Sequence, residues 1–159
     1  MPEAFWVDPA QIRFKISPHI GLQGTKGGNW DIERRHSLAP NAKHRAIWQR
    51  FRDGARWEDT ELFRVNYARR FAGGGMVRGE SSIEALAAQY YDRIDGLFAD
   101  MKANGFRVGP KTPLPLLLIG RDGEVFIGNQ GNHRLAIAQV LGLENFAGKV
   151  LCRHPRSQR

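Results

Sequence analysis

The chain has 159 residues and a formal net charge of +8, with 24 Lys and Arg against 16 Asp and Glu. A chain of this length suits one domain with a hydrophobic core of its own. It has no run of about eighteen apolar residues and no basic-then-apolar order at its start, so we expect neither a membrane-spanning segment nor a signal peptide. The single cysteine, Cys152, can form no internal disulfide, and a cytoplasmic protein is therefore expected.

The N-terminal segment predicts short strands followed by a long loop. Residues 5–16, FWVDPAQIRFKI, carry β-branched and aromatic side chains on both sides of Pro9, which predicts a strand, a turn and a second strand. Residues 17–37 are rich in glycine and polar side chains and have no helical or strand periodicity, which predicts a loop. Loops of this length in compact domains are usually functional or disordered. Trp30 indicates that this loop folds back onto the protein.

Two amphipathic helices are predicted between residues 40 and 75. Pro40 suits the first turn of a helix, and Gly54 ends the amphipathic stretch that follows it. Aromatic residues recur every four positions from residue 63 to residue 71 and predict a second helix, which the glycines at 73–75 close.

A third helix is predicted to begin at a capping box. Ser81 and Glu84 have the spacing at which two side chains cap each other's backbone N–H groups. Apolar residues continue at spacings of three and four from residue 83 to residue 101, and the Asn-Gly pair at 104–105 supplies the stop. The three helices together form a helical insertion at about residues 40–104.

Residues 114–154 predict a strand hairpin, a helix and a final strand. Two apolar strands flank the Asp-Gly pair at 122–123, which is typical of a hairpin turn. The helix expected at 132–141 is apolar on most sides, so it should be buried against a sheet, with Gly142 as its C-cap. This order of strands and helices suits a single α+β domain over residues 1–159.

The run GNQGNHRL at 128–135 lies between the hairpin and the buried helix. Glycines let backbone N–H groups approach an anion closely, and a helix N-terminus offers free donors and the positive end of its dipole. His133 and Arg134 occupy a first turn, where acidic side chains are usually favoured, and this placement makes sense if an anion binds there. Two interpretations stay open: a turn that only connects two buried elements, and a phosphate cradle.

The same residues carry a resemblance to a known superfamily. The segment FIGNQGNHRLAIAQVLGLENFAGKVLCRH resembles the ParB/sulfiredoxin superfamily, in which a strand, a Gly-x-His-Arg or Gly-x-x-Arg turn, an Ala/Leu-rich helix ending in Leu-Gly and a strand follow one another. Residues 131–134 match the turn, and residues 141–142 match the helix end. The segments GGNWD, RFRDGARWEDTELF and IGRDGEVF resemble a ParB-like subgroup with no established activity.

The resemblance implies a small mixed sheet with a turn that binds nucleotide phosphates. Members include ParB proteins that bind and hydrolyse CTP on DNA, sulfiredoxins that use ATP to repair peroxiredoxins, free-serine kinases and some nucleases. By this motif the phosphate-contacting candidates are Gly131, Asn132, His133 and Arg134, and Gly128 and Gln130 in the same run are further candidates. The resemblance therefore implies a protein that binds ATP or CTP with Mg²⁺ and hydrolyses it or transfers a phosphoryl group.

Two departures from the superfamily pattern bear on the reaction. Sulfiredoxins carry a reactive cysteine inside the turn, where this chain has Asn132; its own Cys152 lies in the last expected strand and should be a small core residue. The serine-kinase pattern has an acid before the glycine of the turn, where this chain has Gln130. Sulfiredoxin chemistry is thus not expected, and a kinase reaction needs its acid from elsewhere.

Phosphoryl chemistry needs acids that hold a divalent metal or orient a nucleophile. The catalytic candidates are Asp31 in GNWD, Glu58 and Asp59 in WEDT, and His133 in the turn. Each acid also has a structural interpretation, because Asp59 can cap the following helix and Asp31 can pair with a neighbouring arginine. GLQGTKGG lacks P-loop spacing, and its Lys26 is a further candidate phosphate contact. The histidines lack zinc-site spacing, so no metal ligand is predicted.

Basic residues are concentrated in two places. Residues 34–78 hold eleven Lys and Arg and four Asp and Glu, and residues 149–159 hold four basic and no acidic residues. Such a concentration can attract polyanions, or it can form a solubilising surface. A basic DNA- or RNA-binding module, including a nuclease, and a catalytically inactive interaction domain are therefore alternatives to a nucleotide enzyme.

Overall fold

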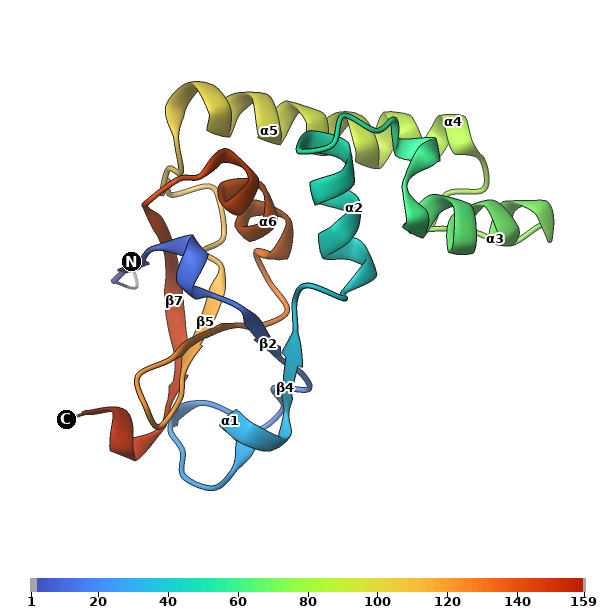
Figure 1. Cartoon of the computed structure of the whole chain (residues 1–159). Helices are drawn as coiled ribbons and strands as arrows, with labels where there is room; N and C mark the ends of the chain where they lie inside the picture. Colours follow the sequence, from blue (N-terminus) through green and yellow to red (C-terminus); the bar gives the residue numbers. More distant parts are fainter. Residues whose placement is uncertain (1–2, 159) are drawn as a thin grey trace.

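The structure, a computed structural model, describes residues 3–158 and contains a mixed sheet of seven strands (Figure 1). The strands are β1 (Phe5–Val7), β2 (Phe14–Ile16), β3 (Gly24–Thr25), β4 (Arg35–Ser37), β5 (Leu116–Ile119), β6 (Val125–Ile127) and β7 (Phe146–Arg153). Their order in the sheet is β1-β7-β5-β6-β2-β4, and β3 also pairs with β7. The α+β class predicted from the sequence is confirmed.

Most of the helical residues lie between β4 and β5 in the chain. The α-helices are α1 (Trp30–Glu33), α2 (Ala42–Phe51), α3 (Ala68–Ala72), α4 (Ile83–Leu86), α5 (Asp92–Asn104) and α6 (Asn132–Leu141). Shorter helical turns are η1 (Pro9–Gln11), η2 (Trp57–Asp59), η3 (Phe63–Tyr67), η4 (Ala87–Tyr91) and η5 (Pro155–Gln158). In Figure 1, α3 and α4 form an arm that extends away from the sheet. No helix within residues 3–158 is both long enough and apolar enough to span a membrane.

The central strand of the sheet is β5. It runs parallel to β7 and antiparallel to β6, so that Leu117 is paired with Val150 on one side and Ile127 on the other. The hairpin between β5 and β6 turns at Gly123, which has a φ of 79°. The hairpin predicted from the Asp-Gly pair is therefore confirmed.

Alternate residues of β5 and β6 pack on opposite faces of the sheet, because successive side chains of a strand point in opposite directions. Leu117 and Ile127 belong to a large hydrophobic cluster that the helices complete. Leu118 and Phe126 belong to a smaller cluster on the other face, which Trp30 completes. The sheet is thus covered on both faces.

Helix α6 is deeply buried within the large hydrophobic cluster. Its residues from Leu135 to Ala138 are each 0% exposed, and α6 packs against both α2 and α5. Gly142 ends the helix with a φ of 65°. The predicted bounds, burial and C-cap of this helix are confirmed.

Residues 17–37 are more ordered than predicted. The expected loop contains β3, α1 and β4, so the prediction of a structureless loop is wrong in part. Trp30 is 4% exposed, and its indole N–H donates to the carbonyl of Lys26 at 2.9 Å. The segment does fold back, as Trp30 indicated, and short strands form because β2 and β7 offer free edges to it.

Two predicted helix starts are displaced by one or two residues. Helix α2 begins at Ala42 with Asn41 as its cap, so Pro40 precedes the helix, and Ser82, not Ser81, caps α4. In each case the capping residue has an extended backbone and a side-chain oxygen that accepts a hydrogen bond from the first turn. The capping box of Ser81 and Glu84 is therefore not formed.

Candidate functional site around the first turn of α6

The turn before α6 holds two glycines against the start of β5. Gly131 has a φ of 92°, and a Cβ at this position would lie 2.7 Å from Cγ of Pro115. At Gly128 a Cβ would lie 3.3 Å from Cβ of Leu116. Glycine is thus required at position 131 whatever the turn binds, and a side chain at position 128 would be in tight contact with Leu116.

Two of the predicted phosphate contacts use their side chains within the protein. The amide nitrogen of Gln130 donates to the carbonyl of Leu114, and that of Asn132 donates to the carbonyl of Gly128. The backbone N–H groups of residues 132–134 donate to no backbone acceptor in the described part of the chain. The turn can therefore offer an anion its backbone donors rather than these amide side chains.

The side chain of His133 reaches from α6 to η4. Its Nε2 atom lies 2.7 Å from the hydroxyl oxygen of Tyr90, and the two groups share a hydrogen bond. Burial lowers the pKa of His133, and nearby positive charges lower it further, to about 4. Burial raises the pKa of Tyr90 to about 12. At neutral pH the pair is thus an uncharged imidazole bonded to an uncharged phenol.

Three cationic side chains from separate elements lie close enough to lower the pKa of His133. Lys43 lies on α2, Arg78 in the turn between α3 and α4, and Arg93 on α5, and each repels a proton on the imidazole. None of the three forms an ion pair with an acid among residues 3–158. Because three positive charges lie in this region and no carboxylate pairs with any of them, the region favours an anion.

Arg78 has a backbone conformation that is uncommon for a residue with a side chain. Its φ is 52°, and that of Gly79 is 81°. Val77 and Glu80 exchange backbone hydrogen bonds of 2.9 and 2.8 Å across them, which is the pattern of a type I′ turn. Asn, Asp or Gly usually fills the first central position of such a turn.

The turn places the guanidinium of Arg78 over an aromatic ring. Its Cζ atom lies 3.8 Å from the centroid of the Tyr90 ring, within the range of a cation–π contact. An open pocket of about 500 Å³ lies beside this contact and is lined by Arg78, Glu80, Gln89, Tyr90 and Arg93. The pocket therefore combines two guanidinium groups with one carboxylate, that of Glu80.

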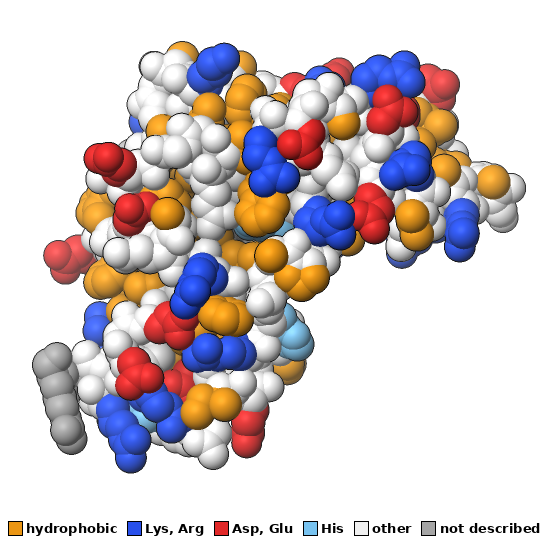
Figure 2. All heavy atoms as spheres, viewed as in Figure 1, with side chains coloured by type: hydrophobic (Ala, Val, Ile, Leu, Met, Phe, Trp, Pro, Cys, Tyr) orange, Lys and Arg blue, Asp and Glu red, His pale blue; other side chains and the backbone are white. Residues whose placement is uncertain are grey.

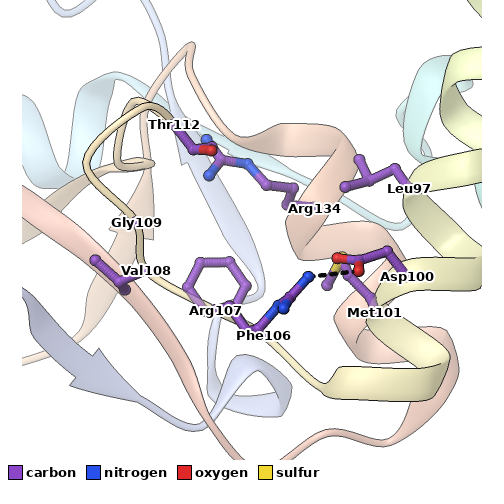
Figure 3. Close-up of a pocket in the computed structure, with 9 residues that line it drawn as sticks. All are labelled: Leu97, Asp100, Met101, Phe106, Arg107, Val108, Gly109, Thr112 and Arg134. Carbon is purple, nitrogen blue, oxygen red and sulfur yellow. Dashed lines mark hydrogen bonds and ion pairs between the residues drawn. The ribbon is translucent and has the colours of Figure 1, made fainter.

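Arg134 has surroundings different from those of His133. Its Nη2 atom donates to the carbonyl of Pro113 at 2.6 Å, and Figure 3 shows the side chain reaching from α6 toward Thr112. Burial lowers the pKa of Arg134, although a guanidinium stays charged at physiological pH. His133 and Arg134, which the sequence motif places in one site, thus lie in different surroundings.

Asp31 and Lys26 do not lie near the turn. The carboxylate of Asp31 accepts hydrogen bonds of 2.7 to 2.9 Å from Arg121, just after the end of β5, whereas the turn packs on the start of β5. Lys26 donates its backbone N–H to Arg153 at the end of β7. The structure therefore places both candidates away from the turn, with Asp31 in a buried ion pair and Lys26 beside the end of β7.

Glu58 and Asp59 lie in η2, next to the tyrosines. The guanidinium of Arg56 donates to Asp59 at 3.0 Å, so this carboxylate is already paired. Trp57 stacks on Tyr91 with ring centroids 4.5 Å apart and fixes η2 in place. Glu58 is exposed and unpaired among the described residues, which leaves it as the available acid of this segment.

Sequence reasoning missed the residues that surround His133. Only Arg78 had a local signal, because an Arg-Gly pair soon after a run of glycines marks a turn. Lys43 and Arg93 lie on helices, where a basic residue indicates a solvated surface, and Tyr90 lies on an apolar stripe, where it indicates core. Their proximity arises only from the packing of α2, α5 and α6.

The donors present suit phosphates better than a metal ion held by protein alone. Within residues 3–158 no three His, Cys, Asp or Glu side chains are close enough together to bind a metal ion. Magnesium in nucleotide sites usually takes one or two carboxylates, with phosphates and waters as its other ligands. Glu80 is the carboxylate that lines the pocket beside Arg78.

Comparison of the chain with protein-family models, curated proteins and solved structures found no match. The resemblance to the ParB/sulfiredoxin superfamily stays a prediction.

Proposed function

We propose that the chain binds a nucleotide of the ATP or CTP type, with its phosphates beside His133. The observation that carries this proposal is that Lys43, Arg78 and Arg93 all act on one imidazole, and none of the three forms an ion pair with an acid among the described residues. A triphosphate supplies the missing negative charge. The free backbone N–H groups at the start of α6 add donors of the kind that bind phosphate oxygens.

The reaction we propose is hydrolysis of the nucleotide or transfer of its phosphoryl group, with Mg²⁺ bound by phosphate oxygens and Glu80. Such reactions depend on positioning and on stabilisation of the charge that develops on the phosphoryl oxygens. Arg78 and Arg93 are placed to supply the positive charge, and Glu80 lines the same pocket. The neutral imidazole of His133 can accept a proton from an attacking hydroxyl or water.

Isothermal titration with ATP, CTP, GTP and ADP in the presence of Mg²⁺ tests the binding. Arg78→Asn removes the charge while keeping a residue that tolerates the left-handed conformation. We expect its Kd to rise by about tenfold or more, because charge-assisted hydrogen bonds are among the stronger ones. The matched control is Arg69→Asn, which removes an exposed charge from α3. Equal affinity in Arg78→Asn and wild type, or no binding by wild type, would refute the proposal.

The reaction is tested separately by phosphate release. We expect Glu80→Gln to keep the nucleotide affinity of the wild type within a few fold and to lose turnover. Glu84→Gln removes an exposed acid of α4 and serves as the control. Turnover by Glu80→Gln at the wild-type rate would remove Glu80 from the reaction without affecting the binding proposal.

A nucleic-acid-binding role is the second candidate, and exposed arginines of the helical arm favour it. Arg69 and Arg70 on α3 are exposed and form no ion pair in the described structure. Much of the basic segment is neutralised, however, since five arginines pair with acids: Arg35, Arg45, Arg50, Arg52 and Arg56. Figure 2 accordingly shows basic and acidic side chains interspersed over the arm on this face.

A salt titration of affinity for duplex DNA separates this candidate from the first. Phosphate contacts predict a steep fall in affinity between about 50 and 200 mM salt, and the double variant Arg69→Ala, Arg70→Ala should weaken DNA binding without affecting nucleotide binding.

An inactive interaction domain predicts no thermal shift with nucleotide or DNA, because only a ligand of the native state stabilises it.

A further inference from the structure

A second cavity lies on the Arg134 side of α6, separate from the pocket beside Arg78. Its volume is about 310 Å³, which is at the lower end of the range for small-molecule sites. Figure 3 shows it between α5, α6 and the segment at 106–112. Side chains from all three line it, and they include two apolar residues of α5 and the guanidinium of Arg134.

Apolar surface makes up about half of the cavity walls. Leu97 and Met101 come from successive turns of α5, and Phe106 and Val108 face them from the following segment. Val108 is 37% exposed, so apolar surface remains open to solvent at this point. An organic group that entered the cavity would remove this surface from water, which is favourable.

The charges in the cavity add up to one uncompensated cation. Asp100 is already paired with Arg107 at 2.6 Å, so these two charges cancel. Arg134 forms no ion pair among residues 3–158 and donates only to the carbonyl of Pro113. A half-buried guanidinium without a carboxylate is costly, because burial removes hydration that no opposite charge replaces.

We infer that this cavity binds a small organic monocarboxylate with a compact apolar body, whose carboxylate pairs with the guanidinium of Arg134. A carboxylate matches the planar fork of arginine and its single charge balances that of Arg134. A phosphate dianion would leave one negative charge unbalanced beside apolar walls. The hydroxyl of Thr112 is placed to donate to the same carboxylate.

This inference does not rest on the proposed nucleotide function, since the two sites share no side chain. Benzoate and hexanoate are the probes, benzamide is the neutral counterpart of benzoate, and phenyl phosphate is its dianionic counterpart. Isothermal titration with the full chain gives the affinities, and methyl NMR spectra report which side chains the probe contacts. Saturating ATP should leave the affinity for benzoate unchanged.

We expect benzoate to bind at least about tenfold more tightly than benzamide or phenyl phosphate, because only benzoate forms a charge-assisted and charge-balanced pair. Val108→Glu places a carboxylate at the mouth of the cavity and should abolish binding. Val65→Glu, at an exposed position of η3, is the control and should not affect binding. Arg134→Gln should act like Val108→Glu; if Arg134→Gln does not fold, the comparison of Val108→Glu with Val65→Glu decides alone. Absence of benzoate binding, equal binding of benzamide, tighter binding of phenyl phosphate, or unchanged binding by Val108→Glu each overturns the inference.

Discussion

A 2.7 Å hydrogen bond between His133 and Tyr90 joins the first turn of α6 to η4, the turn that precedes α5. The guanidinium of Arg78 lies over the ring of the same tyrosine, with its Cζ atom 3.8 Å from the ring centroid. The phenol of Tyr90 thus contacts both the guanidinium of Arg78 and the imidazole of His133. A ligand that neutralises the cations changes the charge that the imidazole experiences.

Nucleotide binding should therefore be coupled to proton uptake by His133. The pKa of His133 without ligand is about 4, lowered by burial and by Arg78, Lys43 and Arg93. An anion offsets the repulsion by the cations, so the pKa rises in the complex and the complex holds more protons. Affinity should then increase as pH falls through the range from about 6.5 to 4.

Titration calorimetry in buffers with different ionisation enthalpies measures this proton uptake directly. His133→Gln is the control, because titration of the ligand's own phosphates is common to both proteins. Proton uptake that is identical in wild type and His133→Gln would show that the imidazole does not sense the ligand.

Tyr90→Phe should destabilise the fold by about 1 kcal/mol, because it leaves the imidazole nitrogen without its hydrogen-bond partner. The aromatic ring under Arg78 is retained, so nucleotide affinity should change little in comparison with Arg78→Asn. Urea unfolding gives the stability, and Tyr91→Phe, which keeps the ring stacked on Trp57, is the matched control. A stability loss of Tyr91→Phe as large as that of Tyr90→Phe would remove the special role of the bond.

Gly131→Ala should destabilise the protein by roughly 1–3 kcal/mol. The φ of 92° disfavours a side chain, and the new Cβ would lie 2.8 Å from Cα of Pro115. Gly96→Ala in α5 is the opposite case, because a Cβ added there would meet no atom within 4 Å; it should stabilise the helix by about 0.5–1 kcal/mol. Urea unfolding of both variants checks the contrast, and a destabilised Gly96→Ala together with an unaffected Gly131→Ala would contradict it.

Asp31→Asn should destabilise the protein at pH 7 and progressively less at low pH. Burial alone would raise the pKa of Asp31, but the hydrogen bonds from Arg121 outweigh it and lower the pKa to about 2. Because the folded pKa lies below the unfolded one, the stabilisation is present above about pH 4 and is lost as pH falls toward 2. It amounts to about 2 kcal/mol.

Unfolding curves of wild type and Asp31→Asn between pH 7 and pH 2 measure this loss. Glu33→Gln changes an exposed acid of the same short helix and should follow the wild type at every pH. A stability difference between Asp31→Asn and wild type that stays constant down to pH 2 would mean that the carboxylate of Asp31 has an ordinary pKa.

The C-terminal unit was predictable because its signals are local. The Asp-Gly pair at 122–123 predicted the hairpin, and the apolar helix at 132–141 predicted its own burial, since turn chemistry and periodicity act over a few residues. The start of α2 was missed because Asn41, and not the preceding Pro40, begins the helix as its cap, and the start of α4 because Ser81 and Ser82 can both serve as caps. Lys43, Arg78 and Arg93 could not be brought together from the sequence, because only the tertiary packing of three helices and a turn does so.

Residues 146–153 leave the ribosome after all the segments to which they pair have been synthesised. Strand β7 contacts β1, β3 and β5, and it joins Phe5 to Gly148 across most of the length of the chain. A nascent chain that has not reached Phe146 therefore has β5 with only one neighbour and leaves part of the apolar core uncovered. Contacts so distant in sequence slow folding and expose intermediates to aggregation. The sheet of this protein can therefore be completed only once residues 146–153 have been synthesised.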